Sequence, residues 1–466
     1  MSTAESLDFP LKRTPLVPPR PPVAPDDMTA VERMRAIRKN AITSWGERAY
    51  REDVIAGSFL GRKSYILNKP DAIRYVLVEN YENYFRTPAG LRVLRPMLGD
   101  GLLIARGKSW KHQRRTLAPA FTPRAVATLV PHMLSATDEA IDELKRKTDQ
   151  PLDLREAMQR MTLEIAGRTM FSLEMGRDGV ALRNFVIAYS ERYASPRMLD
   201  LLLPLSIPSP ADFGRALFRR RWTRFVGKLV RERRSMAAQL SGQQGAPRDL
   251  FDLMVTARDP ETGEAFSDEL LGDEVATMIL AGHETTATAL FWSLYLLSLD
   301  QGAQQELADS VASISVDAST DISKLAFARA VIDEAMRLYP PAFLIARAAT
   351  GPDTVAGLPV AEKDVILISP WLLQRHEKLW HDPHAFIPQR FMPGSPQPDR
   401  FAYMPFGAGP RICIGAHFAL VEATLALAKI IQTFKVEITS TRPVMPVGIV
   451  TTQPDHSPVF RITRRQ

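Results

Sequence analysis

Residues 405–415 read Pro-Phe-Gly-Ala-Gly-Pro-Arg-Ile-Cys-Ile-Gly and contain Cys413, the only cysteine in the chain. An apolar segment with helical spacing, residues 416–431, follows directly, so Cys413 is predicted to lie at the start of a helix. Backbone N–H groups and the positive end of the helix dipole favour a thiolate there, and the glycines let the backbone approach a flat, bulky group. The loop therefore has what a thiolate ligand needs. Considered without its neighbours, a lone cysteine is more often a small buried apolar residue.

The same loop resembles the haem-binding signature of the cytochrome P450 family, Phe-x-x-Gly-x-x-x-Cys-x-Gly. Phe406, Gly409, Cys413 and Gly415 match it without departure. The resemblance implies haem b, iron protoporphyrin IX, as the cofactor, with Phe406 and Gly415 beside it and Cys413 as the axial ligand of the iron. In such proteins the thiolate pushes electron density onto the iron and favours O–O cleavage.

A long helix is predicted over residues 268–299, and it is apolar nearly all round, which indicates a course through the core. Its centre reads Ala-Gly-His-Glu-Thr-Thr at residues 281–286, and such polar groups argue against a membrane span. A threonine inside a helix commonly bonds back to a carbonyl of its own helix. The segment nevertheless resembles the family's oxygen-activation motif, which implies that Glu284 and Thr285 help to deliver protons during dioxygen activation.

Glu334 and Arg337 are spaced i, i+3 ahead of a proline pair. By itself such a pair is often a surface ion pair of little energetic weight. The spacing resembles the family's Glu-x-x-Arg motif, whose charges join the arginine of a downstream Pro-x-Arg-Phe element, here Arg390. The resemblance implies a structural role for the three residues, which is to brace the cysteine loop.

The haem propionates need hydrogen-bond donors at fixed places, and apolar side chains are expected around a lipophilic substrate. The resemblance assigns the propionates to Trp110, Arg114, Arg347 and Arg411. It assigns the substrate pocket to Leu103, Ala281, Ala342, Phe343 and Ile449. Because all five pocket residues are apolar, they do not separate one lipophilic substrate class from another.

The composition is that of a globular protein, with 45% hydrophobic and 24% charged residues. A formal charge of +7 over 466 residues gives no support for nucleic-acid binding. Residues 1–27 are polar and rich in proline, without the apolar stretch of a signal peptide or transmembrane anchor, and a lone cysteine gives no sign of an oxidising compartment. The sequence predicts a cytoplasmic protein with an N-terminal arm, residues 1–27, and one catalytic domain, residues 28–466.

The predicted fold class is mainly α with small β-sheets, and the resemblance implies the triangular cytochrome P450 fold in a single large domain. Apolar spacing and end signals predict helices over residues 28–45, 154–171, 181–193, 216–238, 268–299 and 322–339. Strand-rich stretches are predicted at residues 54–67 and 355–368.

The resemblance implies a haem-thiolate monooxygenase that inserts one oxygen atom from O2 into a lipophilic small molecule. No flavin or iron–sulfur sequence is fused to the chain, so electrons are expected from separate proteins, in the first instance a ferredoxin with its reductase. Docking of that partner on Lys108, Lys111, Arg114 and Arg115 and ordinary solvation of these charges are both open.

Two alternative functions remain. One is a haem-thiolate enzyme that uses peroxide or rearranges hydroperoxides. In the family such members usually lack the acid and threonine pair, which is intact here. The other is a non-catalytic haem-binding module, against which the complete oxygen-activation motif argues.

Overall fold

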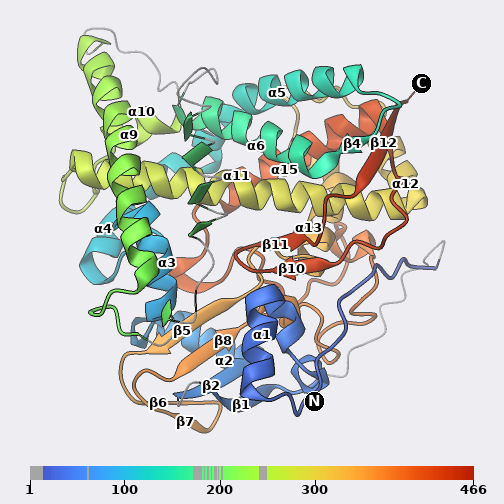
Figure 1. The fold of residues 1–466 in the computed structure, drawn as a ribbon. Coiled ribbons are helices and arrows are strands. Elements are labelled where there is room, and N and C mark those ends of the chain that lie inside the picture. Colours follow the sequence, from blue (N-terminus) through green and yellow to red (C-terminus); the bar gives the residue numbers. More distant parts are fainter. Residues whose placement is uncertain are drawn as a thin grey trace. The chain divides into compact units, whose positions relative to one another are not determined.

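The computed structural model describes residues 14–59, 62–171, 203–240 and 249–465, together with residues 181–182, 184–185, 188–189, 192–193, 197 and 199–200. It is mainly helical (Figure 1). The chain forms two compact units. The first unit comprises Met1–Phe85, Thr137–Arg160 and Thr285–Gln466, and the second comprises Arg86–Ala136 and Met161–Glu284. The long helix α11 (Asp268–Leu299) contributes to both, because the boundary falls between Glu284 and Thr285.

The first unit contains a five-stranded sheet in the order β1-β2-β8-β5-β3. Its strands are β1 (Val54–Phe59), β2 (Arg62–Leu67), β8 (Val365–Ile368), β5 (Ile345–Ala349) and β3 (Tyr84–Phe85). All neighbours are antiparallel except β2 and β8. The two strand-rich stretches predicted from the sequence are therefore joined in one sheet, although about 300 residues separate them along the chain.

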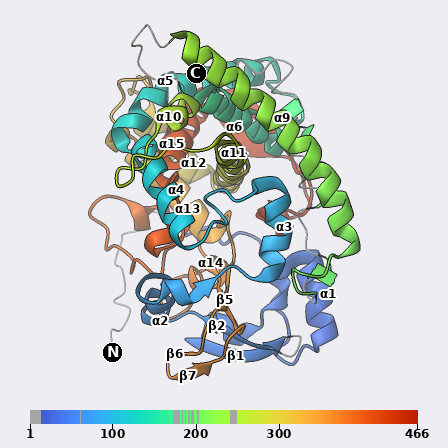
Figure 2. The same ribbon diagram turned by 90° about the vertical axis from the view of Figure 1, so that its left-hand side faces the viewer.

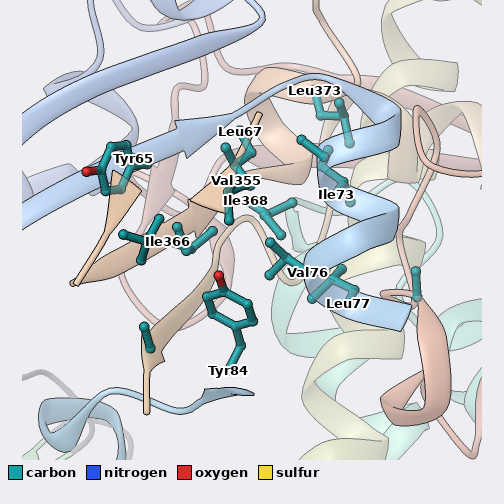
Figure 3. Close-up of a cluster of buried hydrophobic side chains, with 14 of the residues drawn as sticks. Tyr65, Leu67, Ile73, Val76, Leu77, Tyr84, Val355, Ile366, Ile368 and Leu373 are labelled. Carbon is teal, nitrogen blue, oxygen red and sulfur yellow. The ribbon is translucent and has the colours of Figure 1, made fainter. Parts of the chain in front are cut away.

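One face of this sheet is covered by the segment that follows β2. Helix α2 (Pro70–Arg74) continues into a π-helical turn (Tyr75–Glu79), and Ile73 and Val76 pack against Leu67, Ile366 and Ile368, all fully buried (Figure 3). Burial of a large aliphatic side chain contributes about 1.5–3 kcal/mol. This cluster fixes Leu77, which the cysteine loop contacts.

The remaining strands of the first unit form three small sheets. Strands β4 (Leu152–Asp153), β12 (Val459–Arg464) and β9 (Phe434–Ile438) make one, and β6 (Asp353–Val355) pairs with β7 (Leu358–Val360). Strands β10 (Pro446–Gly448) and β11 (Thr452–Pro454) form a hairpin. The hairpin is tied to the Pro340–Pro341 segment, because Thr452 donates its N–H to the Pro341 carbonyl (3.1 Å).

The helices of the first unit agree closely with the sequence, and the differences have local causes. Besides α2, its described helices include α1 (Ala30–Asn40), α12 (Gln301–Val311), α13 (Ala326–Leu338), α14 (Pro370–Leu373) and α15 (Ala416–Thr433). The helix predicted over residues 28–45 stops at Asn40, whose side chain accepts the Ile42 N–H and starts a 3-10 turn, Ala41–Ser44. Thr29 and Glu32 form a capping box at its start.

The second unit holds α3 (Pro88–Leu98), α4 (Gly107–Leu117), α9 (Pro210–Leu240) and α10 (Leu250–Thr256), while α5 (Pro123–Arg146) and α6 (Leu154–Phe171) extend into both units. Helix α9 is longer than the predicted 216–238 and runs as one rod (Figure 2). Trp222 anchors it to α3 by donating its ring N–H to the Met97 carbonyl (2.8 Å). The helix predicted over residues 181–193 lies partly outside the described residues.

Helix α11 has the bounds that the sequence predicts, and most of its residues from Leu271 to Leu297 are buried. Across the described part of the chain, no helix combines the length and apolarity that crossing a membrane requires.

Candidate active site

The cysteine loop presents its thiol outward. Cys413 is exposed, three residues before the first residue of α15, and its N–H donates to the Phe406 carbonyl (2.9 Å). Gly409 has φ +73°, and a Cβ there would overlap the carbonyl oxygen of Leu77, so only glycine fits. Because Cys413 is exposed, its role is not that of a small buried apolar residue. Phe406 and Gly415, the other predicted loop contacts, are partly exposed beside it.

The charge pair on α13 is fully buried. Both Glu334 and Arg337 are 0% exposed, and the guanidinium makes two hydrogen bonds to the carboxylate, of 2.6 and 2.8 Å. Arg390 lies 3.5 Å from the same carboxylate. The remaining Arg337 donors reach the backbone carbonyls of Gln374, Pro383 and Ala385 at 2.7–2.8 Å. The surface ion pair that sequence spacing alone allowed is therefore excluded.

Gln374 carries this brace to the cysteine loop. Its side-chain amide donates to the carbonyls of Met336 and Arg337 at the end of α13, both at 3.0 Å, and its side-chain oxygen accepts the Met404 N–H (3.0 Å). Met404 lies two residues before Phe406, whose carbonyl accepts the Cys413 N–H. Sequence reasoning missed Gln374. Its signal was weak, since a single glutamine after a proline-led helix has no diagnostic neighbours.

Two arginines of the first unit concentrate positive charge near the loop. Arg411, two residues before the cysteine, lies over the ring of Phe85 with 5.4 Å to its centroid. Burial and the charge of Arg411 lower the pKa of Arg347 to about 10. Within the described ranges, the hydrogen bond of Arg347 is to the adjacent Ala346 carbonyl (3.0 Å), and it forms no ion pair with a carboxylate. Two neighbouring positive charges at this place fit the anionic propionates of a haem.

Helix α11 is continuous, but its burial is interrupted at its centre. Ala281 is exposed, and Gly282, Glu284 and Thr285 are partly exposed, whereas the helix on either side is mostly buried. The two residues that the sequence assigns to proton delivery, Glu284 and Thr285, are therefore polar and accessible.

Helix α6 packs against the same turn of α11. The Thr162 hydroxyl donates to the His283 carbonyl (3.1 Å), and a Cβ on Gly282 would lie 2.8 Å from the methyl carbon of Met170. A side chain at position 282 would therefore displace the end of the Met170 side chain. Neither Thr162 nor Met170 was predicted, because their relevance depends on a contact between distant segments.

Helix α4 divides its predicted residues between two environments. Trp110 is 7% exposed and Arg114 is partly exposed, while Lys108 and Lys111 are exposed. Arg115 instead pairs with Asp259 (2.8 Å) and lowers the pKa of that carboxyl. Arg115 therefore forms an ion pair within the fold, and of the four residues of the predicted basic patch Lys108 and Lys111 are the exposed ones.

The predicted pocket residues do not share one environment. In the first unit, Ala342 and Ile449 are both exposed, and the hydrogen bond between Thr452 and Pro341 ties their segments together. Phe343 is 4% exposed and packs near Trp45, with 6.4 Å between ring centroids, so its side chain belongs to the core. In the second unit, Leu103 is partly exposed and Ala281 exposed.

Comparisons with known proteins show the family of the chain. The sequence profile of the cytochrome P450 family matches residues 44–457. Cyclooctatin synthase of Streptomyces melanosporofaciens is 31% identical over 79% of this chain and 80% of its own length. Cytokinin hydroxylase of Arabidopsis thaliana is 31% identical over 77% and 71%. The crystal structure of the cytochrome P450DA haem domain is similar in fold, with a TM-score of 0.76 and 24% identity over 97% of this chain and 99% of that one.

A mainly helical fold with an exposed cysteine in a braced glycine loop defines a haem-thiolate protein. This chain belongs to the cytochrome P450 family. It is a haem-thiolate monooxygenase, and its relatives include cyclooctat-9-en-7-ol 5-monooxygenase of S. melanosporofaciens, 29% identical over 79% of each chain. The predicted fold class and activity are confirmed, whereas the division into an arm and one domain stays a prediction.

Proposed function

We propose that the monooxygenase reaction is carried out on a lipophilic substrate by Cys413, Glu284 and Thr285, with electrons from a separate ferredoxin. The observation that carries this proposal is the exposed thiol of Cys413, held in a glycine loop that the buried Glu334–Arg337 pair braces through Gln374. A fully buried ion pair constrains the loop strongly, because separating the two groups would leave buried charge uncompensated.

The haem is proposed to be haem b. Attachment through thioether bonds uses a Cys-x-x-Cys-His motif, and the only cysteine of this chain is assigned to the iron. Arg347, Arg411, Trp110 and Arg114 would hold the propionates, and the closeness of the positive charges of Arg347 and Arg411 supports the first two assignments. When bound through a thiolate, haem supplies the activation of dioxygen and the oxidation of a C–H bond.

Glu284 and Thr285 are proposed to hold and move the protons that dioxygen reduction consumes. Both side chains are partly exposed at the centre of α11, so water can exchange protons with the carboxylate and the hydroxyl. The Thr162 hydroxyl holds the carbonyl of the preceding residue, His283. The chain thereby keeps two proton-bearing groups in adjacent positions on one helical turn.

The substrate is proposed to be lipophilic because the exposed residues assigned to the pocket are apolar. Ala281, Ala342 and Ile449 are exposed and Leu103 partly exposed, and none of them offers a polar side-chain atom. Phe343, the fifth residue assigned to the pocket, is apolar as well, and its side chain is 4% exposed. A cytoplasmic location remains part of the proposal, since one cysteine gives no sign of an oxidising compartment.

The partner is proposed to be a ferredoxin that docks near the exposed Lys108 and Lys111. Exposed charges steer an oppositely charged partner, and reversing them slows association in a salt-dependent manner. The variant with Lys108→Glu and Lys111→Glu is expected to be reduced about tenfold more slowly at low salt, with the difference shrinking as salt screens the charges. Stopped-flow reduction by a ferredoxin and its reductase measures this. Reversal of Lys63, an exposed lysine of the first unit, is the control, and equal rates for all three proteins would remove the docking site.

The oxygen-dependent reaction is tested against the peroxide-using alternative with one substrate. A lipophilic compound that shifts the haem spin state is turned over with NAD(P)H, a ferredoxin, its reductase and O2, and separately with hydrogen peroxide alone. We expect product mainly in the first reaction, because Glu284 and Thr285 are both present for proton delivery. Product only with peroxide would overturn the proposed electron route, and haem binding without product in either reaction would favour a non-catalytic module.

A further inference from the structure

Two buried acids of α11 accept hydrogen bonds from the backbone of the loop that carries Leu103. Glu274 is 0% exposed, and both its carboxyl oxygens lie 3.1 Å from the Leu102 nitrogen, whose N–H they accept. Asp273, the preceding residue, accepts the N–H of Asp100 (2.8 Å). Two adjacent helix residues therefore satisfy two backbone donors of one loop, at the segment between α3 and α4.

Other groups hold the same loop from different sides. Gln113 of α4 donates its side-chain amide to the Asp100 carbonyl (3.0 Å), and Arg86 donates to the Leu103 carbonyl (2.7 Å). Gly101 admits no side chain, because a Cβ there would overlap the Thr277 hydroxyl. The loop thus lies directly on α11, and its backbone bonds are distributed over α4, α11 and Arg86.

We propose that Glu274 is a positioning residue for substrate binding, which holds the loop that carries Leu103 closed while its carboxyl is protonated and lets it open when the carboxyl ionises. The inference rests on the proposed place of Leu103 in the substrate pocket. Glu274 lies ten residues before Glu284 and takes no part in the proposed proton delivery.

The charges around Glu274 support this behaviour. Burial, and to a smaller degree the neighbouring carboxylate of Asp273, raise the pKa of Glu274 to about 8. Asp100 faces Asp273 from the loop, and Arg219 of α9 lies 3.3 Å from the Asp273 carboxylate on its other side. The Leu102 N–H is the group that lowers the pKa of Glu274. Among the described residues, no positively charged side chain interacts with this carboxyl.

The raised pKa of Glu274 determines how the loop responds to pH. The closed loop binds the Glu274 proton more tightly than an open loop in which the carboxyl is hydrated and has an ordinary pKa of about 4.5. Closing is therefore fully favoured at low pH, and this advantage is lost progressively as the pH rises from about 4.5 to about 8. Because Glu274 is buried and its nearest charged neighbour is another acid, Asp273, the loop should loosen progressively over this pH range.

Hydrogen exchange at the Leu102 amide of the haem-loaded enzyme tests the clamp. Its protection, relative to the intrinsic exchange rate, is expected to fall about thirtyfold between pH 6.5 and pH 9. Glu274→Gln keeps an acceptor for the Leu102 N–H but cannot ionise, so its protection should not change with pH. Glu274→Leu removes the acceptor, so protection should be low at both pH values. Glu269→Gln, at an exposed acid of the same helix, should behave like the unaltered enzyme.

The consequence for binding is measured with 4-phenylimidazole against imidazole, two haem ligands that differ by one apolar ring. The preference for the phenyl compound should weaken from pH 6.5 to pH 9 in the unaltered enzyme, stay constant in Glu274→Gln and be weak throughout in Glu274→Leu.

Leu103→Ala distinguishes a failure of the clamp from a failure of the pocket assignment. If Leu103→Ala lowers the preference but both Glu274 variants match the unaltered enzyme, the clamp is wrong. If Leu103→Ala has no effect, the place of Leu103 in the pocket is wrong, and pH-independent Leu102 protection would overturn the clamp in either case.

Discussion

Replacing Arg337 with lysine is expected to lower the free energy of unfolding by about 3–5 kcal/mol and to release haem. Arg337 holds the carboxylate of Glu334 in a site where both side chains are 0% exposed. It also donates to the backbone carbonyls of Gln374, Pro383 and Ala385, which would lose these hydrogen bonds. A lysine has one ammonium group and cannot reach this fork of acceptors, so a charge and several carbonyls would remain poorly satisfied.

Arg329→Lys is the matched control on the same helix. Arg329 pairs with Asp333 at 2.7 Å, nearly the distance of the buried pair, but its side chain is 40% exposed. The control should therefore cost less than about 1 kcal/mol. Denaturant unfolding and the haem content after purification measure both variants. Equal losses in the two would show that burial of the Glu334–Arg337 pair does not brace the cysteine loop.

Replacing Thr285 with alanine is expected to separate NAD(P)H consumption from product formation. If the Thr285 hydroxyl helps to deliver protons at the right atom, its loss should lower the product formed by about tenfold to a hundredfold, while NAD(P)H is still oxidised and hydrogen peroxide accumulates. Substrate affinity should hardly change, because alanine removes only a small polar group. The ratio of product to NAD(P)H, with peroxide measured in the same sample, gives the result.

Two neighbouring substitutions sharpen this experiment. Thr285→Ser retains the hydroxyl and should recover most of the coupling. Thr286→Ala alters the next residue, which is buried whereas Thr285 is partly exposed, and should leave the ratio nearly unchanged. Unchanged coupling in Thr285→Ala, or the same loss in Thr286→Ala, would contradict the assignment of proton delivery to Thr285.

The sequence predicted those parts of the fold that local pattern determines. The bounds of α11 follow from an apolar run that begins with acidic residues, and those of α6 from its spacing of apolar residues. The end of α1 was missed because it depends on one side chain, Asn40, which also donates to the Pro446 carbonyl of a distant strand. Short strands such as β10 and β11 carry too little pattern to be predicted.

The candidate site shows the same division. Cys413, Glu334 and Arg337 were found because motif spacing is a property of one segment, and the structure adds the reason for the pair, which is its full burial. Gln374, Thr162 and Glu274 were not found as site residues, because each acts by bonding backbone groups of another segment. The place of Phe343 in the pocket stays a prediction; its side chain is buried and lies near Trp45.

The central claim, that Cys413 is the thiolate ligand of a haem iron, is tested most directly by the carbon monoxide difference spectrum of the dithionite-reduced, haem-loaded protein. Carbon monoxide binds opposite the protein ligand and needs no substrate, and the chain has only one cysteine to supply a thiolate. We predict a strongly red-shifted Soret band, which Cys413→His should convert to the band of a histidine-ligated haem. A histidine-like band in the unaltered protein, or a protein that binds no haem, would contradict the account.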